Sequence, residues 1–170
     1  MSDHIDLNDI FARAMQEMAG ENYDRSVALL TDILVADADH KMALTARGAA
    51  FLKSGRKESA IDDFDRVLAI DPGYARARHL RGLAFEARGQ NDEALSDFDR
   101  AIELNPEYGA AYFSRANLHA KMGREDLASQ DFETIAHLTN RNIESFANQN
   151  NVWRSQQMHI EQVMETELNR

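Results

Sequence analysis

Small and apolar side chains return in the same order every 34 residues along most of this chain. Shifting the sequence by that distance superimposes a small residue, a glycine, an alanine, a phenylalanine and a proline. The superimposed residues are Gly48, Gly82 and Ala116; Gly55, Gly89 and Gly123; Ala60, Ala94 and Ala128; Phe64, Phe98 and Phe132; and Pro72 and Pro106. A fixed period of this length is typical of stacked helical units. The pattern therefore predicts three well-matched repeats, at 41–74, 75–108 and 109–142.

The succession of a small residue, a turn glycine, Ala-x-x-x-Phe and a proline resembles the tetratricopeptide repeat (TPR) motif. A weaker copy at 7–40 precedes the three good repeats, and its glycine, Gly20, comes one residue early. The residues that stand in its motif positions are Ala14, Ser26, Leu30 and Ala38. Terminal repeats are often atypical because one of their faces meets water. The resemblance implies a right-handed α-solenoid of four helix pairs, preceded by a short tail at 1–6.

Each repeat is expected to form two antiparallel helices, the first ended by a glycine and the second by a proline. With only two prolines and eight glycines in 170 residues, the composition also favours helix. We therefore expect an all-α protein that is more than ~70% helical and has no strands. The nine expected helices span about 7–20, 23–37, 40–54, 57–70, 75–88, 91–104, 109–122, 125–138 and 141–167.

The C-terminal segment, 143–170, lies beyond the last repeat and has neither glycine nor proline. Its apolar residues follow spacings of three and four, which predicts one long helix. Residues 142–155 are expected to cap the last repeat, and the remainder to overhang it. Four apolar residues on one face of the overhang, Ile160, Val163, Met164 and Leu168, are expected either to pack on their own chain or to form a two-fold homodimer, with the dimer preferred.

Arginine and aspartate recur in two further columns of the repeat. The arginines are Arg13, Arg47, Arg81 and Arg115, and the aspartates are Asp63, Asp97 and Asp131. In each good repeat the two lie 16 residues apart, on the first and second helix respectively. We predict an ion pair between the two helices; the alternative is a row of solvated arginines without partners.

Charge narrows the choice of partners. Of the net charge of −10, most falls within residues 1–40, which have nine acidic and two basic side chains. An acidic surface repels phosphate and anionic lipid, so nucleic acid and membranes are poor candidates and a protein or peptide is expected. The chain has no cysteine, no apolar leader and no run of about 18 apolar residues, so the cytoplasm is the expected location.

In TPR proteins the first helices mainly line a concave groove that accepts a peptide or helix, and the resemblance implies the same here. The inward residues would be Phe11, Met15 and Met18; Met42, Thr45, Ala46, Ala49 and Leu52; Arg76, His79, Leu80, Leu83 and Glu86; and Ala110, Phe113, Ser114, Asn117 and Lys121. This wall is rich in apolar side chains, and an exposed apolar patch usually marks an interaction surface. Methionines suit a surface that adapts to its ligand.

Some TPR domains bind the C-terminal carboxylates of chaperones with lysine, asparagine and arginine at defined groove positions. Those positions here hold residues such as Met15, Ala46 and Leu80 in one frame, or Thr45, Ala49 and Ser114 in the other. The carboxylate clamp is absent in both frames, which disfavours a co-chaperone of that type.

No motif for catalysis is visible. The six histidines show no His-Glu-x-x-His pattern, and there is no glycine-rich phosphate loop. We expect a non-enzymatic protein without metal or cofactor, in which His79 is a packing or hydrogen-bonding residue. Two functions remain open: an adaptor whose groove binds a peptide or helix, and a self-associating structural protein whose C-terminal helix fills the groove or forms a homodimer.

Overall fold

A computed structural model describes residues 6–145, and within that range every regular element is a helix. Seven helices are α1 (Leu7–Ala19), α2 (Tyr23–Ala36), α3 (Lys41–Lys53), α4 (Lys57–Ile70), α5 (Ala75–Ala87), α6 (Asn91–Leu104) and α7 (Gly109–Lys121). An eighth, the 125–145 helix, runs to the end of the described range. The predicted bounds of the first seven helices are correct to within one residue.

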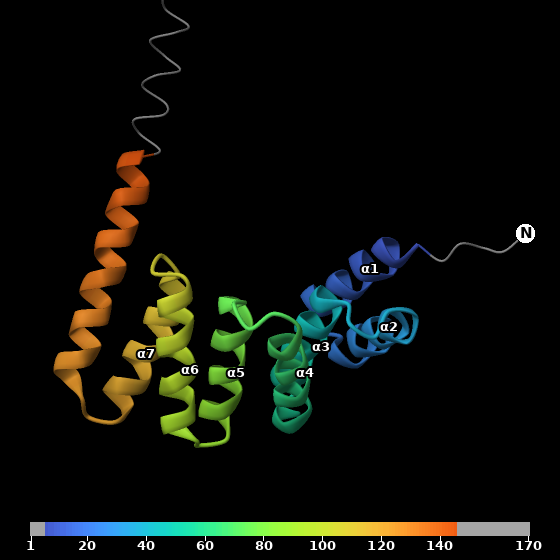
Figure 1. Cartoon of the computed structure of the whole chain (residues 1–170), viewed down its shortest axis with the longest axis horizontal. Coiled ribbons are helices and arrows are strands. Elements are labelled where there is room, and N and C mark those ends of the chain that lie inside the picture. The colour runs from blue at the N-terminus through green and yellow to red at the C-terminus, as the bar shows by residue number, and fades with distance from the viewer. Residues whose placement is uncertain (1–5, 146–170) are drawn as a thin grey trace, which may run out of the picture.

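Successive helices pack side by side and form a row of antiparallel pairs (Figure 1). The first helices of the pairs also touch one another, α1 against α3, α3 against α5 and α5 against α7. This arrangement is the helical-repeat solenoid that the 34-residue period predicts. It also places the residues of the predicted groove on neighbouring helices.

The crossing within each pair depends on a glycine that faces a phenylalanine. A Cβ atom added to Gly48 would lie 2.6 Å from Cε1 of Phe64, and one added to Gly82 would lie 2.6 Å from Cε1 of Phe98. Both rings are completely buried. Each ring therefore occupies the space that the missing side chain leaves, and the close approach of the two helices requires glycine.

The predicted Arg–Asp pairs form in all three good repeats. Arg81 donates from Nε and Nη2 to the carboxylate of Asp97, at 2.7 and 2.8 Å, and the pairs Arg47–Asp63 and Arg115–Asp131 have the same two-pronged geometry. Arg13 makes no such pair among the described residues, since leucine occupies the aspartate position in the first repeat. The bidentate arrangement ties the two helices of a pair together.

Each of these three paired arginines also reaches back to the preceding repeat, a contact that the sequence did not predict. The remaining Nη1 group of Arg47 donates to Thr31, that of Arg81 to Asp65 and that of Arg115 to Asp99. The acceptors again lie 16 residues away, on the N-terminal side. One guanidinium thus connects three helices, and the stack is held by polar as well as apolar contacts.

A left-handed residue ends the turn within each pair. Gly55, Gly89 and Gly123 have φ of 81°, 79° and 72°. In the first repeat the same position is Glu21, with φ of 60°, whereas Gly20 has φ of −82°. The expectation that Gly20 serves as the turn glycine was therefore wrong: the backbone keeps its repeat geometry and imposes the left-handed conformation on a glutamate.

The break predicted between 138 and 141 is absent, because the 125–145 helix passes through both positions (Figure 1). Asn140 stands where Pro72 and Pro106 stop the earlier second helices, and no glycine or proline follows Gly123. Nothing therefore obliges this helix to end there. Residues 142–145 continue the same helix with exposed side chains, so this part of the predicted cap does not lie on the preceding pair. Residues 146–155 of that cap lie outside the described range.

The C-terminal end of the stack leaves apolar surface open. Phe132 occupies the same column as Phe64 and Phe98, yet its exposed fraction is 42% where theirs is 0%. The two buried rings are covered by side chains of the following pair, such as Ala84 and Leu118. Phe132 instead contacts Phe113 edge to face, with ring centroids 6.2 Å apart.

Candidate interaction pocket

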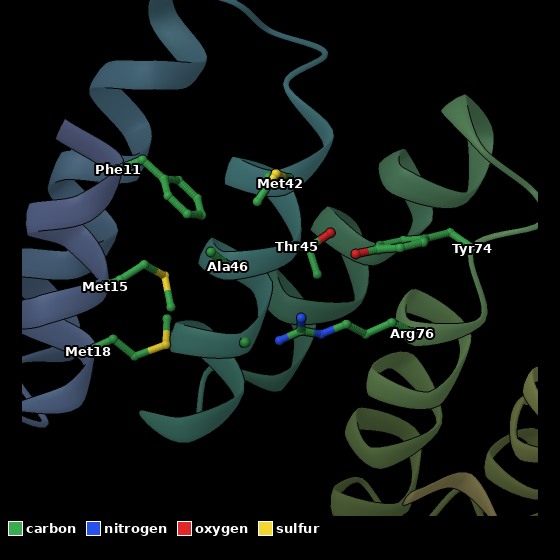
Figure 2. Close-up of a pocket in the computed structure, with 9 residues that line it drawn as sticks. Phe11, Met15, Met18, Met42, Thr45, Ala46, Tyr74 and Arg76 are labelled. Carbon is green, nitrogen blue, oxygen red and sulfur yellow. The ribbon is translucent and has the colours of Figure 1, made fainter. Parts of the chain in front are cut away.

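A pocket of about 230 Å³ lies between α1, α3 and the first turn of α5 (Figure 2). It is lined by Phe11, Met15, Met18, Met42, Thr45, Ala46, Ala49, Tyr74 and Arg76. All of these except Tyr74 belong to the groove predicted from the sequence. The first helices of the first two repeats thus bring their inward residues together around one hollow, with the start of the third repeat opposite.

The walls of the pocket are apolar and adjustable, whereas its floor is rigid. Thr45 and Ala46 are buried on α3, and the Thr45 hydroxyl donates to the backbone carbonyl of Lys41 at 2.8 Å. Met15 on α1 and Met42 on α3 are exposed, and both border the hollow (Figure 2). Because methionine has a flexible, unbranched side chain, these walls can adjust to the shape of an occupant.

Tyr74 closes the pocket on the side of α5 and is held from behind. The Lys41 ammonium lies 4.8 Å from the centroid of the Tyr74 ring, and the same ammonium donates to Asp71 at 2.7 Å. The hydrogen bond with Asp71 is the main cause that raises the pKa of Lys41, so the cation stays charged against the ring. The repeat does signal this residue, because Tyr74 and Tyr108 lie 34 residues apart and each caps a first helix.

Arg76 is exposed at the rim, and its guanidinium extends into the hollow (Figure 2). Within residues 6–145 the structure gives it neither an ion pair nor a hydrogen bond from its side chain. Its charge nevertheless acts on its surroundings. The pKa of His79 is lowered to about 4, mainly by burial and further by the positive charge of Arg76.

His79 does not line the pocket. The residue is 7% exposed, and its ring places Nδ1 3.1 Å from the Tyr108 hydroxyl and Nε2 2.9 Å from the Ser114 hydroxyl. It therefore joins α5 to α7 and to the residue that precedes α7. The expectation that His79 faces an open groove was wrong, whereas its expected part in packing and hydrogen bonding agrees with these contacts.

Other predicted groove residues pack into the core. Leu52 and Leu80 are half-buried against the cluster around Phe64, and Leu83 packs against the cluster around Phe98. These side chains lie on first helices, as expected. They point between helix pairs rather than into the pocket, so they support the fold.

The C-terminal part of the predicted groove is bridged by side chains. Lys121 on α7 forms an ion pair with Glu86 on α5, and the ring of Phe113 packs edge to face against the ring of Phe132. Asn117 lies between Phe113 and Lys121 in the sequence and is half-buried. Its side chain forms no hydrogen bond within the described part of the chain. The four residues predicted for a dimer or self-docking helix, Ile160, Val163, Met164 and Leu168, lie outside the described residues.

The described residues form no cluster of metal ligands: no group of three or more histidine, aspartate or glutamate side chains there is placed to hold a metal ion. Within 6–145, none of the helices combines the length and the apolar character needed to span a membrane.

Two family models match the chain and together cover more than half of it. A model described as "Tetratricopeptide repeat" matches residues 11–75, and one described as "TPR repeat" matches residues 86–123. Both agree with the stacked pairs and the glycine–phenylalanine crossings of the structure. The chain belongs to the tetratricopeptide-repeat family.

Solved TPR structures share this architecture at low sequence identity. A crystal structure of MamA superimposes with a TM-score of 0.74, at 22% identity over 84% of each chain. TTC0263, a thermophilic TPR protein of Thermus thermophilus, gives 0.73 at 21% identity, over 79% of this chain and 75% of that one. The first TPR of Spaghetti (RPAP3), bound to an HSP90 peptide, gives 0.65 at 22% identity, over 72% and 99%. At these identities the likeness shows the fold alone.

No curated protein sequence matches this TPR chain. Proteins of the family are in general interaction modules, so the fold supports a role as a protein–protein interaction scaffold. What the scaffold binds has to be argued from its own side chains.

Proposed function

We propose that this TPR protein is a non-enzymatic adaptor that binds a peptide or helix of a partner protein in the pocket between α1, α3 and α5. The observation that supports this proposal is the pocket itself, with apolar walls from Phe11, Met15, Met18 and Met42 that no helix of the described range covers. Burying such a surface against an apolar side chain of a partner is favourable, because it removes apolar area from water.

The size of the pocket favours side chains of a polypeptide over a small metabolite. Small-molecule sites typically enclose roughly 300–1,000 Å³, and this hollow encloses about 230 Å³. It suits one or two apolar side chains. The rest of the peptide would lie along the first helices, outside the hollow.

The RPAP3 repeat provides a contrast. That domain is bound to the HSP90 peptide SRMEEVD, whereas the positions of the carboxylate clamp here hold residues such as Met15, Ala46 and Leu80. We therefore propose an internal apolar segment as the ligand, rather than a chaperone C-terminus.

A selection from a display library of random 12-residue peptides tests the proposal. The purified full chain should enrich peptides with a leucine, methionine or aromatic anchor. Met42→Glu should then weaken binding of a selected, fluorescently labelled peptide at least about tenfold, because it places a charge in the apolar wall.

Val35→Glu is the matched control. It makes the same change from an exposed apolar residue to glutamate on α2, away from the pocket, where the side chain of Val35 is 83% exposed. Its binding should equal that of the unmodified protein. A selection that enriches no apolar anchor, or equal losses for the two variants, would contradict the proposal.

The second candidate is self-association, favoured by the open apolar end of the stack at Phe113, Leu127 and Phe132. Sedimentation of the full chain and of a chain truncated after residue 155 separates the candidates. A dimer that becomes a monomer on truncation would support self-association through the C-terminal segment. A monomer in both cases, with peptide binding intact, would support the adaptor.

A further inference from the structure

We propose that Met15 and Met42 are sites of reversible oxidation, and that peroxide lowers the affinity of the pocket for its ligand by converting their thioethers to sulfoxides. The inference rests on the proposed function, because it concerns the regulation of the same pocket. It starts from the distribution of sulfur in the molecule. The chain has no cysteine, and three of the four methionines among the described residues, Met15, Met18 and Met42, line the pocket.

The repeat itself does not require methionine at the two exposed positions. One and two repeats after Met42 the same column holds Arg76 and Ala110, and one repeat after Met15 it holds Ala49. The fold therefore accepts charged and small residues in these columns. The two thioethers belong to the surface of the pocket and are not needed for the crossing of the helices.

The exposure of the methionines sets the order in which they should react. Met42 is 57% exposed and Met15 is 37% exposed, and both border the open hollow (Figure 2). By contrast, Met18 packs against the hydrophobic core of the first two repeats, and Met122 packs against the cluster around Phe98. Because oxidation favours accessible sulfur, we expect Met42 to react first, Met15 second and the two packed methionines last.

The reaction needs only a peroxide as the oxidant. The thioether sulfur attacks one peroxide oxygen, and an S–O bond forms while the O–O bond breaks. The departing hydroxide takes the proton from the transferred oxygen and leaves as water. The sulfur is thereby oxidised by two electrons to the sulfoxide, and the peroxide is reduced.

A sulfoxide changes what the pocket can hold. It replaces a flexible apolar side chain by a polar one, and its oxygen would be left without a hydrogen-bond partner when an apolar anchor covers it. Met15 and Met42 stand at the surface, outside the hydrophobic core clusters of the described fold, so their oxidation should leave the solenoid intact. Methionine sulfoxide reductases, one for each epimer, reverse the change.

Timed treatment of the full chain with hydrogen peroxide, ended by catalase, tests the inference. Peptide mapping by mass spectrometry should show oxygen gained at Met42 and Met15 before Met122. At that stage the Kd for a display-selected peptide that lacks methionine should be at least about tenfold higher, with an unchanged melting temperature. Treatment with both sulfoxide reductases should restore the original Kd.

Two variants locate the effect. The double variant Met15→Leu, Met42→Leu has no thioether at the exposed positions, and Met122→Leu is the matched control outside the pocket. Each protein is compared with itself before and after peroxide, so that a difference in basal affinity does not enter the comparison. The Kd of the double variant should not change with peroxide, whereas that of Met122→Leu should rise at least about tenfold, as in the unmodified protein.

The outcomes separate the two proposals. Oxidation of Met42 no faster than that of Met122, an unchanged Kd after oxidation of Met42 and Met15, or an equal rise in the double variant would overturn the redox role and leave the peptide-binding function in place. No enrichment of apolar anchors in the display selection would overturn the function itself.

Discussion

Replacing Gly82 by alanine tests the packing argument most directly, because it adds a single carbon to the helix crossing. The new Cβ would lie 2.6 Å from Cε1 and 2.8 Å from Cδ1 of Phe98, and 3.2 Å from the carbonyl oxygen of Ala94. Nonbonded carbon atoms prefer about 3.5–4.0 Å, so the buried ring has to retreat by about 1 Å. Overpacking of this kind costs about 1–3 kcal/mol.

The expected net effect is smaller, because alanine is a better helix former than glycine by about 1 kcal/mol. Gly109→Ala isolates the two contributions. A Cβ at Gly109, the first residue of α7, meets no atom within 4 Å, so this variant should be neutral or slightly stabilised. Urea unfolding followed by circular dichroism should give a free energy of unfolding about 1–3 kcal/mol lower for Gly82→Ala than for Gly109→Ala.

A double-mutant cycle identifies the ring as the cause. Phe98→Leu removes Cε1, the ring atom nearest to the added methyl, and leaves a smaller, flexible side chain that can move aside. Gly82→Ala should therefore cost less in that background, with a coupling energy of at least about 1 kcal/mol. Equal stability of Gly82→Ala and Gly109→Ala, or strictly additive effects with Phe98→Leu, would refute the proposed crossing.

Three further predictions concern single residues. Glu21→Gly should raise the free energy of unfolding by about 1 kcal/mol, because Glu21 has φ of 60° where the other repeats have glycine; a lower melting temperature would contradict it. The pKa of His79 is about 4 in the folded state and about 6.5 when unfolded, so the unfolded state binds the proton first as the pH falls. Up to about 3 kcal/mol of stability should therefore be lost between pH 6.5 and pH 4. The melting temperature of His79→Gln should decline less steeply over that range. If the melting temperatures of the two proteins declined in parallel with pH, His79 would be excluded as the cause. Asp97→Asn should lower the free energy of unfolding by about 2–4 kcal/mol, because the 5% exposed carboxylate of Asp97 accepts from two arginines. Glu103→Gln, in an ion pair that is largely exposed, should lower it by less than about 0.5 kcal/mol. Similar losses for the two variants would contradict a larger contribution from the buried pair.

Several features followed from local patterns alone. The 34-residue period predicted the bounds of seven helices. In the good repeats glycine and proline act on the backbone within a few residues of their own positions, and the first repeat keeps the same length although it lacks the proline. The spacing of 16 between Arg81 and Asp97 was enough to predict their ion pair, since it puts both at the same level of two antiparallel helices. Most residues of the pocket, such as Phe11, Met42 and Arg76, were placed on the inner face by the same reasoning.

Two predictions from the sequence failed because the sequence has no local signal for the feature concerned. The missing proline at Asn140 permits the 125–145 helix to continue but does not require it, so the expected break was assigned from the repeat length alone. Tyr74 was overlooked as a pocket residue because it precedes α5, although its period matches that of Tyr108.

The tertiary structure alone decided which inward residues remain open. Thr45, His79 and Phe113 occupy one column of the repeat, yet the first forms the buried floor of the pocket, the second is buried between α5 and α7, and the third is 54% exposed. A period specifies which face of a helix a residue is on. Whether that face is covered depends on the side chains of the next repeat, as Tyr108 and Ser114 cover His79. Stacked helices meet through these side chains, which lie far from His79 in the sequence, so the local pattern around His79 does not reveal the contact.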